Sequence, residues 1–161
     1  MRALCKKEAY IADKLFATLG TEVGKIYIDP PSPTDSESYV YQGGKEVLVI
    51  DTIGFIRDLP PQLIKAFAST LEDSIQSDVL LHVIDATDPD RQRKIEIVAD
   101  ILKHIKATQP MIYVFNKIDQ LDNDTKKIIA DQYHGLPHMF VSALSGEGLE
   151  ELKQKMVGMV S

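Results

Sequence analysis

Strand-length apolar runs that alternate with helix-like segments constrain this chain more than any other feature of its sequence. Three runs carry apolar residues at consecutive positions: Glu46–Asp51 (EVLVID), Val79–Asp85 (VLLHVID) and Met111–Asn116 (MIYVFN). Such runs are typical of strands that are buried on both faces, as in a parallel sheet covered by helices. The sequence therefore predicts an α/β fold, with a mostly parallel sheet and helices on both faces.

The segments between these runs complete the alternation. Over Arg91–Lys106, for example, Ile95, Val98 and Ile101 fall on one helical face. Residues 29–44 are rich in Pro, Ser, Asp, Gly and Tyr and predict a long connection. We see no internal repeat and expect a single domain. The other expected elements are the end of a helix over Arg2–Asp13, a short strand over Lys25–Ile28, helices over 60–76, Asn123–Gln132 and Leu149–Val160, and a strand over Met139–Ser142.

Composition excludes several classes of protein. The net charge is -6, and no Lys/Arg stripe interleaved with aromatic residues is present, which argues against a nucleic-acid-binding surface in this segment. No apolar run reaches the roughly 20 residues of a membrane span, and a single cysteine, Cys5, excludes an internal disulfide. We therefore expect a cytoplasmic protein. His82 lies within an apolar run without a second ligand at metal spacing, so we interpret it as a core residue.

The exit of the third core strand carries Asn116, Lys117, Ile118 and Asp119 (NKID), at the sheet edge where α/β proteins bind ligands. One carboxylate here can accept hydrogen bonds from the guanine N1–H and the exocyclic amine, and adenine offers no matching pair of donors. A site that loses such hydrogen bonds discriminates by roughly 10⁴-fold. Asn116 would tie neighbouring loops together, and the Lys117 stem would cover one face of the base. Taken alone, the motif is equally explained as a polar turn.

Two other strand exits carry residues of complementary chemistry. At the exit of the first run, Asp51 can hold Mg²⁺ through water, and Gly54 lets its backbone N–H approach a γ-phosphate. The exit of the last strand carries Ser142, Ala143 and Leu144, where the Ala143 N–H could reach the guanine O6. Three motifs in this order argue against a purely structural explanation. They predict a site for GTP or GDP with Mg²⁺.

The run from Asp51 to Pro60 (DTIGFIRDLP) resembles the corresponding segment of the HflX family of translation-factor-like GTPases. Lys14–Leu19 (KLFATL) is similar to the switch I segment of that family, and the resemblance covers nearly the whole chain except residues 29–44. It implies a P-loop GTPase domain over 1–161. Its parts would be the end of the first helix with switch I (1–24), the long connection (29–44) and the remaining strands and helices (46–161).

The resemblance also implies roles for individual residues. Thr18 would close over Mg²⁺ and the γ-phosphate, so that Thr18 and Asp51 form the metal site. Phe55 stands where Ras-like GTPases have the glutamine that orients the attacking water. With Thr18, Gly54 and Phe55 as the catalytic set, the family predicts slow intrinsic hydrolysis that a partner accelerates. In the full-length family member, that partner is expected to be the large ribosomal subunit.

Two departures from the family pattern concern the phosphates. The 161 residues contain no G-x-x-x-x-G-K-[ST] loop, whose backbone, lysine and hydroxyl hold the phosphates and Mg²⁺. By the same resemblance, we expect the family strand that precedes this loop to be absent from these residues as well. After Thr18 the family continues TLDPTTR, whereas this chain has TLGTEVG. We expect these changes to impair the binding of phosphates and the hydrolysis of GTP.

Three hypotheses follow from these observations. The first is an HflX-type GTPase seen as a fragment, with the phosphate loop encoded directly upstream. The second is a degenerate, non-hydrolysing G domain that serves as a binding module. The third, an unrelated α/β nucleotide-binding or effector-binding domain, does not explain why three motifs occur in the expected order.

Overall fold

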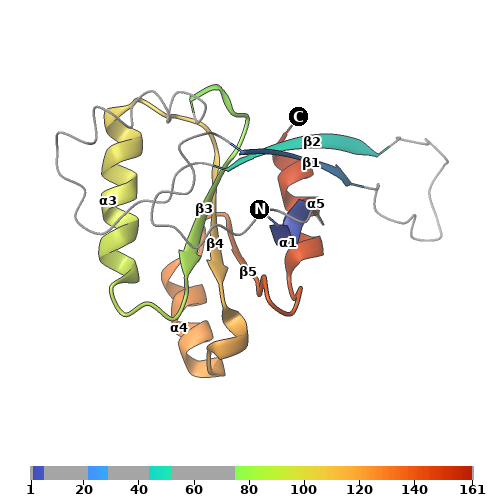
Figure 1. Cartoon of the computed structure of the whole chain (residues 1–161). Coiled ribbons are helices and arrows are strands. Elements are labelled where there is room, and N and C mark those ends of the chain that lie inside the picture. The colour runs from blue at the N-terminus through green and yellow to red at the C-terminus, as the bar shows by residue number, and fades with distance from the viewer. Residues whose placement is uncertain (1, 6–21, 29–43, 52–74, 161) are drawn as a thin grey trace.

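The computed structural model describes residues 2–5, 22–28, 44–51 and 75–160. Figure 1 shows α3 and α5 on opposite sides of the strands β3 and β4, with α4 near the carboxyl ends of these strands. The elements in chain order are α1 (Arg2–Cys5), β1 (Glu22–Ile28), β2 (Lys45–Asp51), β3 (Leu80–Asp85), α3 (Arg91–His104), β4 (Met111–Asn116), the 3-10 turn η1 (Ile118–Gln120), α4 (Asn123–Gln132), β5 (His138–Phe140) and α5 (Leu149–Met159).

Strands β3, β4 and β5 form a parallel sheet with β4 in the centre. Asp85 lies opposite Asn116 in the β3–β4 register, and Phe115 lies opposite Phe140 in the β4–β5 register. The ladder continues past the strand ends, because the Ala86 N–H donates to the Asn116 carbonyl at 3.0 Å. The loops that follow the three strands therefore begin at one edge of the sheet, where ligands of α/β proteins bind.

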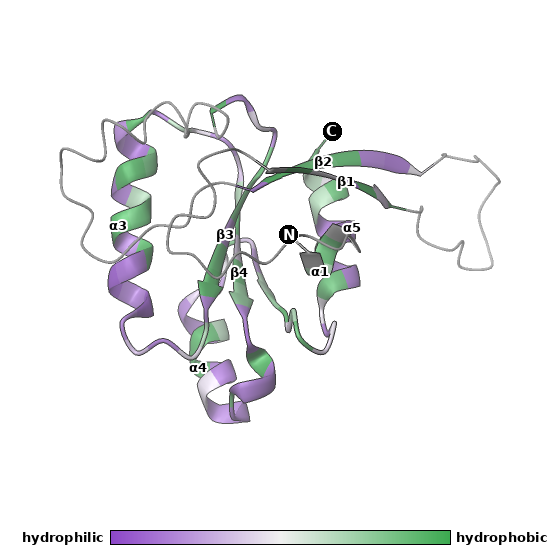
Figure 2. Cartoon of the chain, in the orientation of Figure 1, coloured by the Kyte–Doolittle hydropathy of each residue, from purple (hydrophilic) through white to green (hydrophobic). Residues whose placement is uncertain are grey.

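The continuous apolar run of β4 is buried on both faces. Val114 and Phe115 are 2% and 0% exposed, and alternation along a strand sends their side chains to opposite faces. One face belongs to a core with α3 and α4, made by Ile84, Ala86, Ile95, Phe115, Ile129 and Tyr133. The other belongs to a core with α5, made by Ile112, Val114, Val141, Leu152 and Met156. Figure 2 shows the matching pattern on α3, which carries hydrophobic and hydrophilic stripes.

The strands β1 and β2 correct one expectation from the sequence. We predicted that 46–51 is a buried strand of the parallel sheet, but β2 pairs antiparallel with β1, with Val23 opposite Ile50. Leu48 and Ile50 are 56% and 38% exposed, so one face of β2 is open, while Val47 and Val49 pack against the α5 core. Figure 1 shows the β1–β2 pair crossing the direction of β3 and β4. Within the described residues, no backbone ladder joins the two sheets.

Most of the other predicted elements appear where the sequence placed them. β4 and α4 have the expected bounds, and β3, α3, β5 and α5 differ from expectation by a few residues at their ends. The prediction that β3 is buried on both faces is wrong in part, because Val83 is 61% exposed. β1 is three residues longer than predicted because it begins at Glu22. Of the helix expected over 60–76, only residues 75 and 76 are described, and both are helical. Most of the expected Arg2–Asp13 helix and of the 29–44 connection lies outside the described residues.

His82 lies in β3 with its imidazole largely buried against the Tyr113 ring, the two ring centroids being 5.8 Å apart. Its Nδ1 atom is buried without a hydrogen-bond partner. Burial lowers the pKa of His82 from 6.5 to about 4, since the charged form would lose its hydration. This environment agrees with the interpretation of His82 as a core residue.

The helices of the described ranges include none with the length and apolar character needed to cross a membrane.

Candidate functional site

The loop after β4 turns sharply as soon as the strand ends. Lys117 has φ 68° and ψ 33°, a left-handed conformation that non-glycine residues adopt only occasionally, and the 3-10 turn η1 follows directly. The Ile118 N–H donates to the Val141 carbonyl at 3.3 Å and anchors the turn to the end of β5. As a result, Asp119 is exposed at the carboxyl edge of the sheet while Ile118 is buried in the core.

Two side-chain hydrogen bonds connect the β4 loop with the β5 loop. The Ala143 N–H donates to the Asn116 Oδ1 at 2.9 Å, and the Ser142 hydroxyl donates to the Asp119 Oδ1 at 2.5 Å. Asn116 therefore ties neighbouring loops together, as the sequence predicted. The Ala143 N–H, which we expected to be available for a guanine O6, is occupied by Asn116 in this structure. A carbonyl bound at Ala143 would have to replace that hydrogen bond.

Ser142 is the centre of the β5 loop. It is a fully buried polar residue with 0% exposure, and its hydroxyl oxygen also accepts a hydrogen bond from the Ser145 N–H at 3.1 Å. Its own N–H donates to the Glu147 carbonyl, and its carbonyl accepts from the Gly146 N–H at 2.8 Å. Leu144, by contrast, is 85% exposed at the tip of the loop. The loop is thus held rigidly on the side that faces Asp119.

Gly148 closes this loop and precedes α5, and no larger residue fits there. Its φ is 73°, and a Cβ atom at this position would lie 2.1 Å from the Phe140 carbonyl oxygen. We expect Gly148→Ala to lower the free energy of unfolding by roughly 2 kcal/mol, because strain in the left-handed region adds to the clash. Denaturant unfolding of the variant measures this loss.

Gly146 provides the matched control, since its φ is 87° but a Cβ there would meet nothing within 4 Å. Gly146→Ala should therefore show the backbone strain without the clash, and a smaller loss of stability than Gly148→Ala. Equal losses in the two variants would contradict the close approach to Phe140.

An ion pair links the β4 loop to the end of β3. The Lys117 Nζ lies 2.7 Å from the Asp85 Oδ2, and the Asp85 Oδ1 accepts from the Thr87 N–H at 3.0 Å and the Thr87 hydroxyl at 2.7 Å. Burial alone would raise the pKa of Asp85, but the hydrogen bonds from Lys117 and Thr87 outweigh it and lower that pKa. The same hydrogen bond is the main reason that the pKa of Lys117 is raised.

Sequence reasoning assigned no role to Asp85, although a signal was present. The residue ends a core strand, and the other residues of the site were predicted at strand exits.

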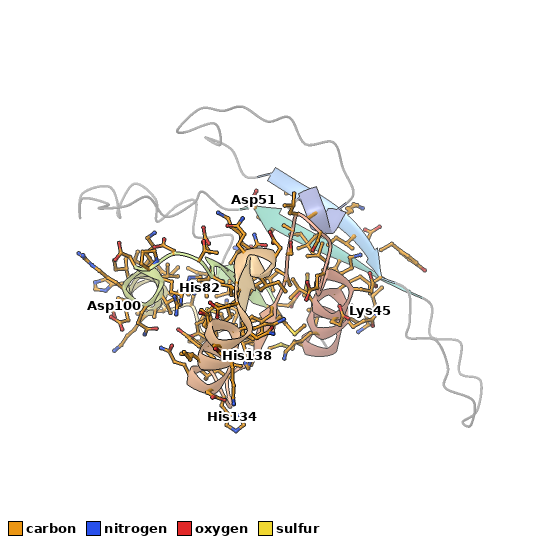
Figure 3. The ribbon with its side chains drawn as sticks, turned by 90° about the horizontal axis from the view of Figure 1, so that it is seen from below. Lys45, Asp51, His82, Asp100, His134 and His138 are labelled. Carbon is orange, nitrogen blue, oxygen red and sulfur yellow. The ribbon has the colours of Figure 1, made fainter. Side chains whose placement is uncertain are left out.

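The structure describes only part of the predicted site. It brings together Asn116, Lys117 and Asp119 of one loop with Ser142, Ala143 and Leu144 of the next. Asp51 is the exposed last residue of β2 (Figure 3), and no described hydrogen bond or ion pair joins it to these loops. Thr18, Gly54 and Phe55 lie outside the described residues. In the described ranges, no three His, Cys, Asp or Glu side chains gather as a metal site.

Comparison with known proteins places this arrangement in a family. A family profile described as a 50S ribosome-binding GTPase matches residues 1–117. The GTPase HflX of Caldanaerobacter subterraneus is 44% identical over 123 residues, which are 76% of this chain and 26% of that protein. The GTPase HflX of Escherichia coli is 37% identical over 98% of this chain and 34% of its own length. The match with this chain thus spans about a quarter to a third of the length of these relatives.

Solved structures show the same fold. A crystal structure of Aquifex aeolicus Era matches 99% of this chain and 51% of that chain with a TM-score of 0.68 and 24% sequence identity. The G235S variant of SsGBP matches 98% of this chain and 48% of that chain with a TM-score of 0.62 and 23% identity. These matches confirm the α/β architecture of a P-loop GTPase domain. Together with the matching profile and the HflX relatives, they show that the chain belongs to the family of 50S ribosome-binding GTPases, as its resemblance to HflX predicted.

Proposed function

We propose that this chain recognises guanine nucleotides through the loops that follow β4 and β5. The observation that carries the proposal is the hydrogen bond that the Ser142 hydroxyl donates to the Asp119 Oδ1, which connects the β5 loop to the exposed carboxylate of the β4 loop. Ser142 holds one oxygen of the exposed Asp119 carboxylate in place. A carboxylate that is oriented before the ligand arrives loses little freedom on binding, which favours affinity and specificity.

In this proposal each residue has a separate role toward the base. Asp119 accepts hydrogen bonds from the guanine N1–H and exocyclic amine, and the apolar stem of Lys117 covers one face of the ring. Ala143 and Leu144 offer backbone N–H groups near the guanine O6, with Ala143 giving up its bond to Asn116. Adenine presents an acceptor nitrogen (N1) and a C2–H group where guanine presents two donors, so it leaves the Asp119 carboxylate unpaired.

We further propose that the intact protein hydrolyses GTP. Thr18 and Asp51 would hold Mg²⁺, which at such sites neutralises phosphate charge, and Gly54 would approach the γ-phosphate. The exposed Asp51 carboxylate fits this role, because Mg²⁺ takes oxygen ligands, keeps several waters and needs only one or two protein carboxylates. With Phe55 in the position of the water-orienting glutamine, intrinsic hydrolysis should be slow. By analogy with the family name, we propose the large ribosomal subunit as the partner of the full-length protein, which would act in the cytoplasm.

Titration of this chain with GDP, GTP and ADP in the presence of Mg²⁺ tests the proposal. We expect the backbone amide signals of Asn116 and Ala143 to shift in NMR spectra with GDP and GTP, at concentrations at least about 100-fold lower than with ADP. Equal response to ADP would contradict guanine recognition.

The same titration separates a GTPase from a non-hydrolysing binding module. Phosphate release from bound GTP would support the enzyme, whereas base-selective binding without release would favour the degenerate G domain. The lack of a G-x-x-x-x-G-K-[ST] motif within these 161 residues is the observation that supports the second outcome for this chain.

A further inference from the structure

We infer that Asp85 is a positioning residue of the base site, which holds the Lys117 ammonium away from Asp119 and so keeps the Asp119 carboxylate open to guanine. This inference rests on the proposed function and assigns a task to a residue at the end of the neighbouring strand.

The Asp85 carboxylate is held in an orientation that faces Lys117. Asp85 and Asn116 are paired residues at the ends of β3 and β4, so the two loops start side by side. Thr87 donates two hydrogen bonds, from its N–H and its hydroxyl, to the Asp85 Oδ1. These bonds fix the orientation of the carboxylate and leave its Oδ2 to pair with the Lys117 Nζ at 2.7 Å.

Lys117 has other carboxylates within electrostatic reach. Asp119 and Asp88 both contribute to the raised pKa of Lys117, after the larger contribution of Asp85. Asp88 already forms an ion pair with Lys94. If Asp85 lost its charge, Asp119 would exert the next largest attraction on the Lys117 ammonium, and Asp119 is the carboxylate that the guanine base needs. A Lys117 ammonium on Asp119 would compete directly with the guanine N1–H and amine.

The backbone conformation of Lys117 supports the inference that Asp85 binds the ammonium while Asp119 remains open to the base. The left-handed conformation of Lys117 reverses the chain between β4 and η1, and the Gln120 N–H donates to the Lys117 carbonyl at 3.0 Å. The main chain is thus fixed on both sides of Lys117, while its side chain remains 48% exposed. A long exposed side chain takes many rotamers unless a partner holds its end, and in this structure Asp85 is that partner.

Guanine affinity in single and double variants tests the inference. We expect Asp85→Asn to weaken GDP binding by about three- to fivefold, the range that a half-exposed ion pair supports. In a Lys117→Met background, which keeps an apolar stem and removes the ammonium, Asp85→Asn should have no further effect. An equal loss in both backgrounds would show that Asp85 supports the loop without acting through Lys117, and would overturn the inference. Asp100→Asn, an exposed carboxylate on α3 (Figure 3), is the matched control.

A second measurement does not depend on the ligand. The rate at which an amine-acylating reagent modifies Lys117, followed by mass spectrometry with the exposed Lys127 as internal reference, reports how firmly Asp85 holds the ammonium. We expect Asp85→Asn to raise that rate at least about threefold, because the uncharged amine becomes more abundant. An unchanged rate would overturn the inference while leaving the guanine site in place. Wild-type protein that shows no preference for GDP over ADP would instead overturn the proposed function, and the role of Asp85 toward guanine with it.

Discussion

Replacement of Asp119 by asparagine is expected to change the base preference of this chain from guanine to xanthine. The Asp119 carboxylate offers two acceptors to the two donors of guanine, whereas an asparagine offers one acceptor and one donor. Xanthine carries a carbonyl in place of the exocyclic amine, so it matches the asparagine pattern. We expect Asp119→Asn to weaken GDP binding by more than about 100-fold and to create binding of xanthosine diphosphate, measured by calorimetric titration.

The hydrogen bond from Ser142 makes this variant a clean test of the base contact. An asparagine oxygen can still accept from the Ser142 hydroxyl, which now lies 2.5 Å from the Asp119 Oδ1, so the two loops should stay connected. Asp131→Asn, an exposed carboxylate on α4, removes the same charge elsewhere and should leave GDP binding unchanged. If GDP binds Asp119→Asn as tightly as the wild type, the base is not recognised at Asp119.

The second large effect concerns acid stability and arises from His82. Its pKa is about 4 in the folded protein against 6.5 for the free side chain, so the unfolded chain binds more protons at pH values between these two. Above pH 6.5 the imidazole is neutral in both the folded and the unfolded chain, so its buried position costs no free energy of protonation. As the pH falls from 6.5 toward 4, the free energy of unfolding decreases progressively. At about pH 4 this pKa shift corresponds to a decrease of about 3 kcal/mol.

His82→Phe keeps an aromatic ring beside Tyr113 and cannot take up a proton. We expect the free energy of unfolding of this variant, measured in denaturant at pH 7 and pH 4.5, to fall less over that interval than that of the wild type. His134→Phe removes an exposed imidazole and should leave the acid sensitivity in place. An identical pH dependence in His82→Phe and wild type would show that the His82 ring is hydrated in the folded state.

The sequence analysis predicted the bounds of β4 correctly because the residues of this strand face a single kind of environment. The run MIYVFN over 111–116 is apolar throughout because β4 is the central strand and has helices on both faces. The NKID motif begins at the last residue of β4, and Ser142–Leu144 lies just beyond the end of β5, so their neighbourhood followed from the parallel order of these strands.

The sequence analysis was wrong about β2 because apolar residues do not report their own burial. In EVLVID, Val47 and Val49 pack on the core, whereas Leu48 and Ile50 stand on an open face and look the same in sequence. The use of the Ala143 N–H by Asn116 and the pairing of Asp85 with Lys117 were also beyond sequence reasoning. Both depend on side-chain directions at loops whose turn is set by the left-handed backbone of Lys117.

The crossing of the two sheets has a mechanical consequence for the proposed site. Asp51, the predicted Mg²⁺ ligand, is the last residue of β2, whereas Asp119, the predicted guanine ligand, follows β4 of the other sheet. In the described residues these sheets are held together by packing such as that of Val47 and Val49 on the α5 core, and side-chain packing resists sliding less than a ladder of backbone hydrogen bonds does. The distance between Asp51 and Asp119 is therefore set by side-chain packing, and a nucleotide that bound both residues would connect the two sheets directly.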